Sequence, residues 1–389
     1  MKQFFKKNWL IMIIFLFTFF LRFWSVPELF YFGIDEEYHS LLALSQIKDL
    51  HPIWIGLSAG KTGYYIGPGL VYLHALLLWI GKLDPVILAY AASVVGITTL
   101  IVFYFVAENL LGKKTAIVST AFYAFLPFVL QYDRRFWNST LVPLISLLIF
   151  FCLVKSFKDA RWHVALAFLI GLSFHIHASL LIYVPIYFIV LIYQYIKIRR
   201  INFSLLFISL LIFLILYSPL IVYDFVHNFD NLKTPLRLLQ HKELGAKFNN
   251  YYFLGFIPLI SLWLGKYLVK LNRGILIFLL IFYIFNAFLT VTRWSTNSGL
   301  STKKELIRNT IGKIGNKSFR LETTEKYLYF GGWRYLFEAY GKKPDSSQAD
   351  EMFGWIYPRE ISPKKPDLKV IITSDPRSRG YKAIIRKNE

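Results

Sequence analysis

The sequence contains a single cysteine, Cys152, in 389 residues. One cysteine cannot close a disulfide within the chain or build a thiolate metal site, and Cys152 lies in an apolar run where a small buried side chain is expected. Three common motifs are also missing, namely G-x-x-x-x-G-K-[ST], G-x-G-x-x-G and H-E-x-x-H. The absence of the first two leaves nucleotide-binding chemistry without support, and the third is a zinc-binding motif.

Acidic residues are scarce, at 23 Asp and Glu against 44 Lys and Arg, which gives a net charge of +21. In a soluble protein this excess would suggest nucleic acid as a partner. Here the basic residues fall mostly in short tracts between apolar runs and in the polar C-terminal part. They therefore suit a role in membrane topology, with membrane lipids rather than nucleic acid as neighbours.

Apolar residues dominate the rest of the chain, of which 56% is hydrophobic and 19% aromatic. A soluble core of this length could not hide that much apolar surface, so we predict an all-α polytopic protein of the plasma (cytoplasmic) membrane. About nine runs are candidates to cross a bilayer, although two of them fall short of the ~20 residues that a span needs. They are residues 9–26, 85–111, 115–132, 141–154, 162–176, 179–196, 204–223, 251–268 and 275–292.

The first run and the distribution of lysine and arginine predict the orientation of the chain. The first run is too long for a signal peptide and lacks a small-residue cleavage site, so it is expected to be a retained helix with the N-terminus in the cytoplasm. Residues 70–80 are too short to span and are predicted to lie in the membrane interface. This choice puts all the basic tracts on the cytoplasmic side, namely residues 113–114, 155–161, 197–200 and 266–273.

The chain divides into two parts of different composition. Residues 1–292 form the predicted membrane domain, and an odd number of spans leaves residues 293–389 outside. This second part is charged and bears prolines, with a helical stretch at 301–314 and strand-like runs at 319–323 and 370–373. It is predicted to be a small soluble, extracytoplasmic α+β domain.

Three adjacent carboxylates, Asp35, Glu36 and Glu37, follow the first apolar run. Carboxylates are costly in hydrocarbon and stable in water, so the cluster is expected at the membrane surface, where an amphiphilic substrate presents its polar head. The alternative is structural, since Asp35 could cap a helix over residues 36–50 whose first turn carries Glu36 and Glu37. The motif alone leaves both interpretations open.

Two further polar clusters are predicted on the same outer face. The first is Asp133, Arg134 and Arg135, which either act on a substrate or anchor the chain in the interface together with neighbouring aromatic residues. The second is His175 and His177 at the end of a predicted span. Two residues apart on a continuing helix, their rings would point apart, which favours two hydrogen-bonded histidines over a metal pair.

Residues 56–69 form a glycine-rich loop that follows a predicted helix end at His51 and Pro52. The loop carries Lys61, Tyr64 and Tyr65 and has no helical or strand periodicity. Long connections of this kind often carry binding residues, so we predict that this loop contacts a substrate.

The segments described above follow an order that a known superfamily shares. They are Leu21-Arg22-Phe23-Trp24, Asp35-Glu36, the loop with Lys61, the interfacial helix, Gly112-Lys113-Lys114, Pro127 before Asp133-Arg134-Arg135, and residues 171–177 and 218–223. This order resembles the GT-C glycosyltransferases of the protein O-mannosyltransferase and aminoarabinose lipid A transferase superfamily. The likeness covers roughly residues 9–230, and the C-terminal part resembles an extracytoplasmic appendage of some bacterial members.

The resemblance implies transfer of a sugar from a polyprenyl-phosphate carrier to a lipid, glycan or protein acceptor on the outer side of the membrane, by an inverting single displacement. Asp35 maps to the family's first-loop acid and is the expected base, with Glu36 beside it and Asp133 as the acid of the second outer loop. A lipid phosphate is a good leaving group, so the enzyme needs this base and cations that hold the phosphate's charge. The expected substrate-binding residues are Lys61, Tyr64, Tyr65, Arg134, Arg135, His175 and His177.

Other classes of function make different predictions. A transporter or flippase for lipid or polysaccharide would carry ionisable residues near mid-span and two repeated halves with broken helices, and neither is evident. A membrane receptor without catalysis would leave the acidic and arginine clusters unexplained. No cofactor is required, although a divalent metal ion shared by Asp35 and Asp133 stays an open alternative because hard cations accept carboxylates. An integral-membrane enzyme is the preferred interpretation.

Overall fold

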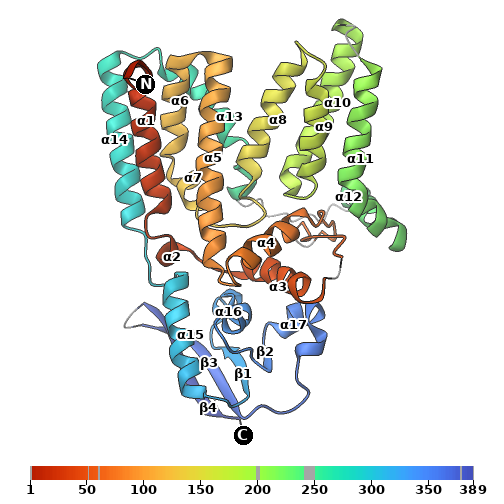
Figure 1. Cartoon of the computed structure of the whole chain (residues 1–389), viewed down its shortest axis with the longest axis vertical. Coiled ribbons are helices and arrows are strands. Elements are labelled where there is room, and N and C mark those ends of the chain that lie inside the picture. Colours follow the sequence, from red (N-terminus) through yellow and green to blue (C-terminus); the bar gives the residue numbers. More distant parts are fainter. Residues whose placement is uncertain are drawn as a thin grey trace.

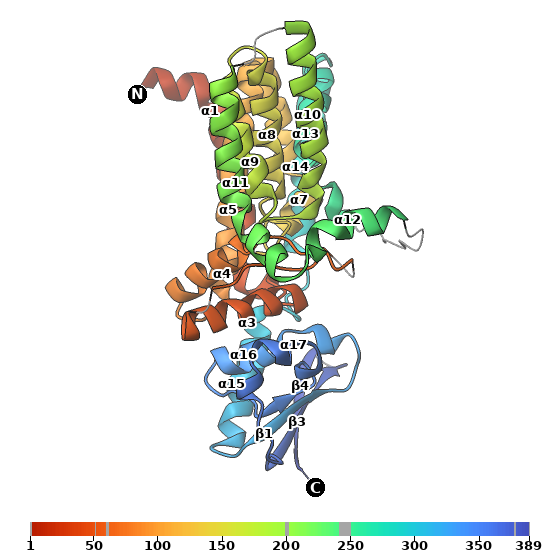
Figure 2. The same ribbon diagram turned by 90° about the vertical axis from the view of Figure 1, so that its right-hand side faces the viewer.

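The structure is a computed structural model of the chain and describes residues 2–50, 52–59, 62–198, 202–240, 250–376 and 379–388. Three layers follow one another along the long axis of the molecule (Figure 1). A bundle of helices is followed by a layer of helices that lie across its end, and then by a C-terminal region with a sheet. The same order is visible after a quarter turn (Figure 2).

The bundle contains the apolar helices of the chain. They are α1 (Lys2–Phe23), α5 (Val86–Leu111), α6 (Lys113–Ala124), α7 (Pro127–Tyr132), α8 (Val142–Ser156), α9 (Trp162–Ser173), α10 (Tyr183–Tyr193), α11 (Phe203–Val226), α13 (Ile257–Leu268) and α14 (Arg273–Thr292). A 3₁₀ turn, η1 (Ala178–Ile182), and a π turn, η2 (Gln194–Ile198), extend α10 at its two ends.

Four helical stretches in the described parts of the chain are long and apolar enough to cross a membrane: Val86–Leu111, Ala178–Lys197, Phe203–Val226 and Arg273–Thr292. Shorter apolar helices run beside them in the bundle (Figure 1). The outer surfaces of three of the long stretches are apolar, since Ile189, Ile215 and Phe278 are each about two-thirds exposed. Large apolar side chains on this scale face lipid in a membrane protein. The predicted class, a mostly helical multi-pass membrane protein with a small C-terminal sheet, is confirmed.

Two of the predicted spans differ from the structure. The run at 115–132 is not one helix, because α6 ends at Ala124 and α7 begins at Pro127. The proline cannot donate a helical N–H, and it forces Leu126 into an extended conformation (φ −67°, ψ 115°). The run at 251–268 begins as a 3₁₀ turn, η3 (Asn250–Phe253), and is α-helical only from Ile257 in α13.

The layer that crosses the end of the bundle consists of α2 (Val26–Leu29), α3 (Ile34–Asp49) and α4 (Gly69–Ile80). Helices α3 and α4 lie across the bundle axis and pack on each other (Figures 1 and 2). This arrangement agrees with the prediction that residues 70–80 do not span. Helix α3 has no single apolar stripe because the C-terminal region covers another of its faces.

All the loops singled out from the sequence lie at one end of the bundle, next to α3 and α4 (Figure 1). They are the connections before α3, before α4, between α7 and α8, and between α9 and η1. The basic residues Lys113, Lys155 and Lys266 lie on helix ends at the opposite end of the bundle. The chain therefore separates its candidate site from its basic tracts, while the orientation in the membrane stays a prediction.

The C-terminal region is a four-stranded sheet with helices. It contains α15 (Leu300–Ile314), β1 (Phe319–Thr323), α16 (Trp333–Ala339), β2 (Ser346–Ser347), α17 (Asp350–Phe353), β3 (Leu368–Asp375) and β4 (Gly380–Lys387). The strand order is β2-β1-β3-β4, with β1 parallel to both neighbours and β4 antiparallel to β3. The predicted helix and two strands are present, whereas β4 and helix α12 (Asp230–Gln240) were not predicted.

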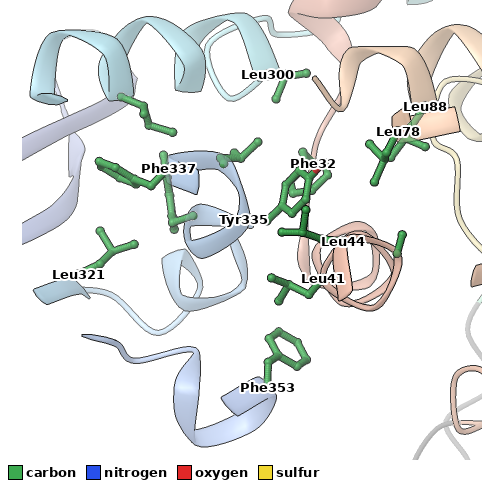
Figure 3. Close-up of a cluster of buried hydrophobic side chains, with 14 of the residues drawn as sticks. Phe32, Leu41, Leu44, Leu78, Leu88, Leu300, Leu321, Tyr335, Phe337 and Phe353 are labelled. Atoms are coloured by element: carbon green, nitrogen blue, oxygen red, sulfur yellow. The ribbon is translucent and has the colours of Figure 1, made fainter. Parts of the chain in front are cut away.

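The crosswise layer and the C-terminal region share one hydrophobic core. Phe32 stacks on Tyr335 with ring centroids 5.6 Å apart, and Leu41 and Leu44 of α3 face α16 and α17 (Figure 3). This core continues through Phe337 to the sheet. The two parts predicted as separate domains, 1–292 and 293–389, are therefore packed together through α3.

Candidate active site

An open cavity of about 240 Å³ lies at the end of the bundle that carries the predicted site loops. Residues from five separate segments converge on it. They are Asp35, Leu57, Ser58, Ala59, Ile66, Trp137, Asn138, His177, Ala178, Tyr251 and Tyr252. Among these described lining residues, Asp35 is the one acid, and several of the others are aromatic.

The start of helix α3 presents Asp35 to this cavity. Gly33 occupies the N-cap position, and its backbone N–H donates to Glu36 Oε2 at 3.1 Å. The helix start is thus capped by Glu36 and not by Asp35, which answers the structural alternative posed by the sequence. The Asp35 carboxylate has no hydrogen bond or ion pair to another described residue and remains available to a ligand.

The surroundings of Asp35 change its acidity. Burial and the neighbouring Glu36 carboxylate raise the pKa of Asp35, the Arg135 guanidinium opposes this, and the result is a pKa of about 6. A carboxyl with a pKa near 6 is ionised at neutral pH and takes up a proton more readily than an ordinary aspartate. That property suits a general base.

Glu36 and Arg135 join two of the predicted clusters. Glu36 is fully buried and accepts two hydrogen bonds from Arg135, Nε to Oε1 at 2.8 Å and Nη2 to Oε2 at 3.0 Å. The guanidinium also lies 4.7 Å from the centroid of the Trp137 indole ring, which lines the cavity. Glu36 is thus engaged as an orienting partner, and Arg135 brings positive charge beside Asp35.

Asp133 and Arg134 take positions that differ from the expectation. Asp133 Oδ2 lies 2.8 Å from Nε and 2.7 Å from Nη2 of Arg22 on α1, and both side chains are buried. Arg134 donates to the backbone carbonyls of Leu21 and Trp24 at the end of the same helix. Neither residue lines the cavity, so the expectation that they face a substrate is corrected: they tie the α7–α8 loop to α1.

A metal ion shared by Asp35 and Asp133 does not fit this arrangement. The Asp133 carboxylate is neutralised by Arg22 and lies next to Arg134, and a cation placed there would face two guanidinium groups. In the described parts of the chain, no group of three or more His, Cys, Asp or Glu side chains could hold a metal ion.

The two predicted histidines are both held by hydrogen bonds. His175 Nδ1 accepts from Gly69 N–H at 3.2 Å, and its Nε2 donates to the Leu216 carbonyl at 2.7 Å. His177 Nδ1 accepts from Ser179 N–H at 3.1 Å while its ring borders the cavity. The prediction of hydrogen-bonded histidines is confirmed, and only His177 reaches the site.

The predicted binding loop is described in part. Lys61 falls outside the described residues. The backbone of Tyr65 pairs with the side chain of Asn231 through an N–H to Oδ1 bond of 2.6 Å and an Nδ2 to carbonyl bond of 3.0 Å. Tyr64 is buried and, like Tyr65, is not among the residues that line the cavity, whereas Ser58 and Ala59 of the same loop are.

Comparison with known proteins identifies the fold. A family model described as dolichyl-phosphate-mannose-protein mannosyltransferase matches residues 66–223. Two crystal structures of ArnT from Cupriavidus metallidurans, one bound to undecaprenyl phosphate and one in the apo state, align with a TM-score of 0.63 at 11% identity. These alignments cover 95% and 96% of this chain, and 94% of each ArnT chain. The chain therefore shares the GT-C fold of ArnT, and its residues 66–223 resemble the mannosyltransferase family. Among curated proteins, none matches it by sequence.

Four rings form one side of the cavity, here called the aromatic wall, which the sequence did not predict. Trp137 meets Tyr251 edge to face with centroids 4.9 Å apart, Tyr251 stacks on Tyr252 at 4.6 Å, and Tyr252 contacts the ring of His177 at 5.4 Å. The four rings come from three connections that are far apart in sequence. The available signal was the pair Tyr251-Tyr252, which was assigned to the start of a predicted span.

Two polar atoms beside this wall lack partners. Trp137 Nε1 and Asn138 Oδ1 are buried and have no hydrogen-bond partner among the described residues. Unsatisfied buried polar groups are uncommon and costly, so these two atoms beside the cavity are candidates to bond a ligand.

Ser58 lies within a match to the hydrolase pattern G-x-S-x-G at residues 56–60. That pattern indicates a nucleophile only on a sharp turn between a strand and a helix. Here Ser58 forms an isolated antiparallel bridge with Tyr65 inside the loop before α4. Ser58 therefore lacks the strand–turn–helix setting in which the pattern indicates a nucleophile.

Proposed function

We propose that this GT-C protein is a membrane glycosyltransferase that moves a sugar from a polyprenyl-phosphate carrier to a hydroxyl acceptor. The observation that carries the proposal is Asp35, a carboxylate with a raised pKa and no partner among the described residues, at an open cavity walled by aromatic rings. The fold shared with ArnT, whose crystal structure contains undecaprenyl phosphate, supports a lipid-linked donor.

The reaction is an inverting single displacement. Asp35 accepts the proton of the acceptor hydroxyl as its oxygen forms a bond to the anomeric carbon, and the bond from that carbon to the phosphate oxygen breaks. The departing lipid phosphate keeps the electron pair, and Asp35 later releases its proton to water. Arg135, held by Glu36 beside the cavity, supplies positive charge for the leaving phosphate, and Lys61 is kept from the sequence as a second cation.

The aromatic wall is the proposed subsite for the sugar ring. Faces of pyranose rings pack on aromatic side chains, and the unpartnered Trp137 Nε1 and Asn138 Oδ1 would each gain a sugar hydroxyl as a partner. Asp35 must stay free to act as the base, and the described lining residues offer no second acid for a cationic amino sugar. A neutral hexosyl group therefore fits this subsite better than an aminopentosyl group.

The end of the bundle that holds the cavity is proposed to be extracytoplasmic. Lys113, Lys155 and Lys266 lie at the opposite end, where the positive-inside rule expects the cytoplasm. A cysteine introduced at Ser346 in the Cys152→Ser background is expected to react with an impermeant maleimide in intact cells, and one at Lys114 is not. The reverse pattern would contradict the proposed orientation.

The proposed activity is tested without knowledge of the acceptor. A deletion strain is complemented with wild type, Asp35→Asn or Asp49→Asn, and surface glycolipids, glycans and glycoproteins are compared by mass spectrometry. Asp49 is an exposed acid at the other end of α3 and serves as the matched control. We expect a hexose to be missing from one surface component in the deletion and Asp35→Asn strains only. Restoration by Asp35→Asn, or transfer by purified enzyme from a nucleotide sugar without lipid carrier, would refute the mechanism.

A further inference from the structure

A lysine from the C-terminal region is buried next to the segment that carries Asp35. Lys303, in the first turn of α15, is fully buried, and its Nζ donates to the carbonyls of Phe32 at 2.7 Å and Gly331 at 2.6 Å. Aromatic rings surround it, with Nζ 4.6 Å from the centroid of Tyr31 and 5.1 Å from that of Trp333. A buried amino group is costly unless such contacts compensate its lost hydration.

The contacts of Lys303 belong to a set of ties around the start of α3. The backbone N–H of Leu300 donates to the Phe30 carbonyl at 2.9 Å. The backbone N–H of Tyr335 donates to Oε1 of the fully buried Glu37 at 3.0 Å. The C-terminal region thus binds residues on both sides of Asp35, which lies between Phe32 and Glu37 in the chain.

Lys303 also lies close to the charges beside Asp35. The Tyr31 ring contacts Lys303 and, at 5.9 Å, the guanidinium of Arg135. Arg135 in turn holds Glu36 through its bidentate ion pair. Lys303 and Arg135 therefore share the Tyr31 ring as a neighbour, just before the start of the helix that places Asp35 at the cavity.

The two hydrogen bonds do not depend on the charge of Lys303. Burial lowers the pKa of Lys303 to about 7, while Glu37 and Glu36 oppose the shift. A neutral amine has two N–H donors and an ammonium has three, so both forms can serve the Phe32 and Gly331 carbonyls. A methionine of similar length would fill the space without the desolvation cost but would leave both carbonyls without a donor.

We propose that Lys303 is a positioning residue for Asp35. By donating to the Phe32 carbonyl, it holds the segment that begins α3 in place. The C-terminal region therefore contributes to the geometry of the site. The proposal rests on the proposed function in treating Asp35 as the reacting group. The proposal gives the region after residue 292 a role in the reaction. Without that role, the region would be an appendage to an active site that is complete without it.

The neighbouring Lys304 provides a matched control. It lies on the same helix and pairs with Asp84, outside the candidate site. Purified full-length wild type, Lys303→Met and Lys304→Met are compared by hydrogen exchange of residues 30–37 and by the pH dependence of Asp35 labelling with a carbodiimide and glycine ethyl ester. Neither measurement requires a sugar substrate, so a failure of the proposed function would not obscure the result.

Loss of two hydrogen-bond donors should open the first turn of α3 more often. We expect Lys303→Met to speed exchange of residues 30–37 by about tenfold or more and to shift the midpoint of Asp35 labelling, while Lys304→Met matches wild type. If the enzyme assay is in hand, Lys303→Met lowers kcat with little change in KM. Equal exchange and equal labelling in the two folded variants would overturn the proposal.

Wild-type protein provides the test if Lys303→Met does not fold. In rising denaturant, residues 30–37 and residues 300–304 should exchange in one opening event with a common rate, because the proposal makes them one unit. Exchange of the two segments in separate events would refute it.

Discussion

Asp35 and Asp133 have the same side chain, but their surroundings are opposite in character. Asp35 borders an open cavity, has no partner among the described residues, and has a pKa raised to about 6. Asp133 is buried and held by Arg22, with both nitrogen contacts under 3 Å. A carboxylate without a partner can accept a proton from a substrate, whereas a paired and buried one stabilises the fold. We therefore propose that the loop with Asp35 serves the reaction and that the loop with Asp133 serves stability.

The comparison is tested most strongly by Asp35→Asn. We expect this variant to lose about 10²–10⁴ in turnover, because an amide cannot act as a general base. The protein should remain folded, since the Asp35 side chain ties no other described segment in place. The measurement is transfer from a polyprenyl-phosphate hexose by purified enzyme, with Asp49→Asn as the control. Turnover near that of wild type would show that the reactive acid lies elsewhere.

Asp133→Asn should have the opposite effect. Removing one charge of a buried ion pair leaves Arg22 without its counter-ion, which typically costs about 3–5 kcal/mol of folding stability. The buried Cys152 reports unfolding, because it reacts with a fluorogenic maleimide only when it becomes exposed. We expect a lower midpoint on heating, with turnover per folded molecule reduced less than in Asp35→Asn. A stable Asp133→Asn enzyme without activity would instead restore the catalytic role predicted from the sequence.

The pH dependence sharpens the contrast for Asp35. Because the base must be ionised, kcat/KM should rise with pH to a plateau above about 6. The folded pKa lies above the ordinary value of 3.8, so the folded state holds the proton more tightly and loses stability as pH rises from about 4 to about 6.

Asp35→Asn removes that titrating group, so the variant should unfold at a higher temperature than wild type at pH 7 and at a similar temperature at pH 4. Heating with the Cys152 probe at both values measures the difference. A variant less stable than wild type at pH 7 would contradict the environment described for Asp35.

The smallest expected effect concerns the sugar subsite. Asn138→Ala removes one proposed hydrogen bond to a sugar hydroxyl, which corresponds to about 0.5–1.5 kcal/mol, or a roughly two- to tenfold loss in kcat/KM. The loss in kcat/KM should be similar for every hydroxyl acceptor. The unfolding temperature should not change. Ser179→Ala, next to the cavity but bonded to His177, is the control for local disturbance. An acceptor-dependent loss would move Asn138 to the acceptor side of the site.

Several site features followed from local sequence, and others required partners far away in the chain. The helix after Asp35 was expected, and so was the crosswise helix at 70–80. The role of Asp133 was not, because its partner Arg22 lies 111 residues earlier and a local motif gives no sign of that pairing. The aromatic wall was missed for the same reason, since Trp137 and Tyr252 come from different loops.

The sequence by itself determined the apolar helices, the acid cluster after the first of them, and the separation of basic tracts from polar loops. These features follow from hydrophobicity and charge, which act along the chain without regard to distant contacts. Only the tertiary structure decided which acid stays without a partner, because Glu36 is engaged by Arg135 and Asp133 by Arg22. It also decided that Lys303 reaches the Phe32 carbonyl, since burial and pairing are properties of groups that folding brings together.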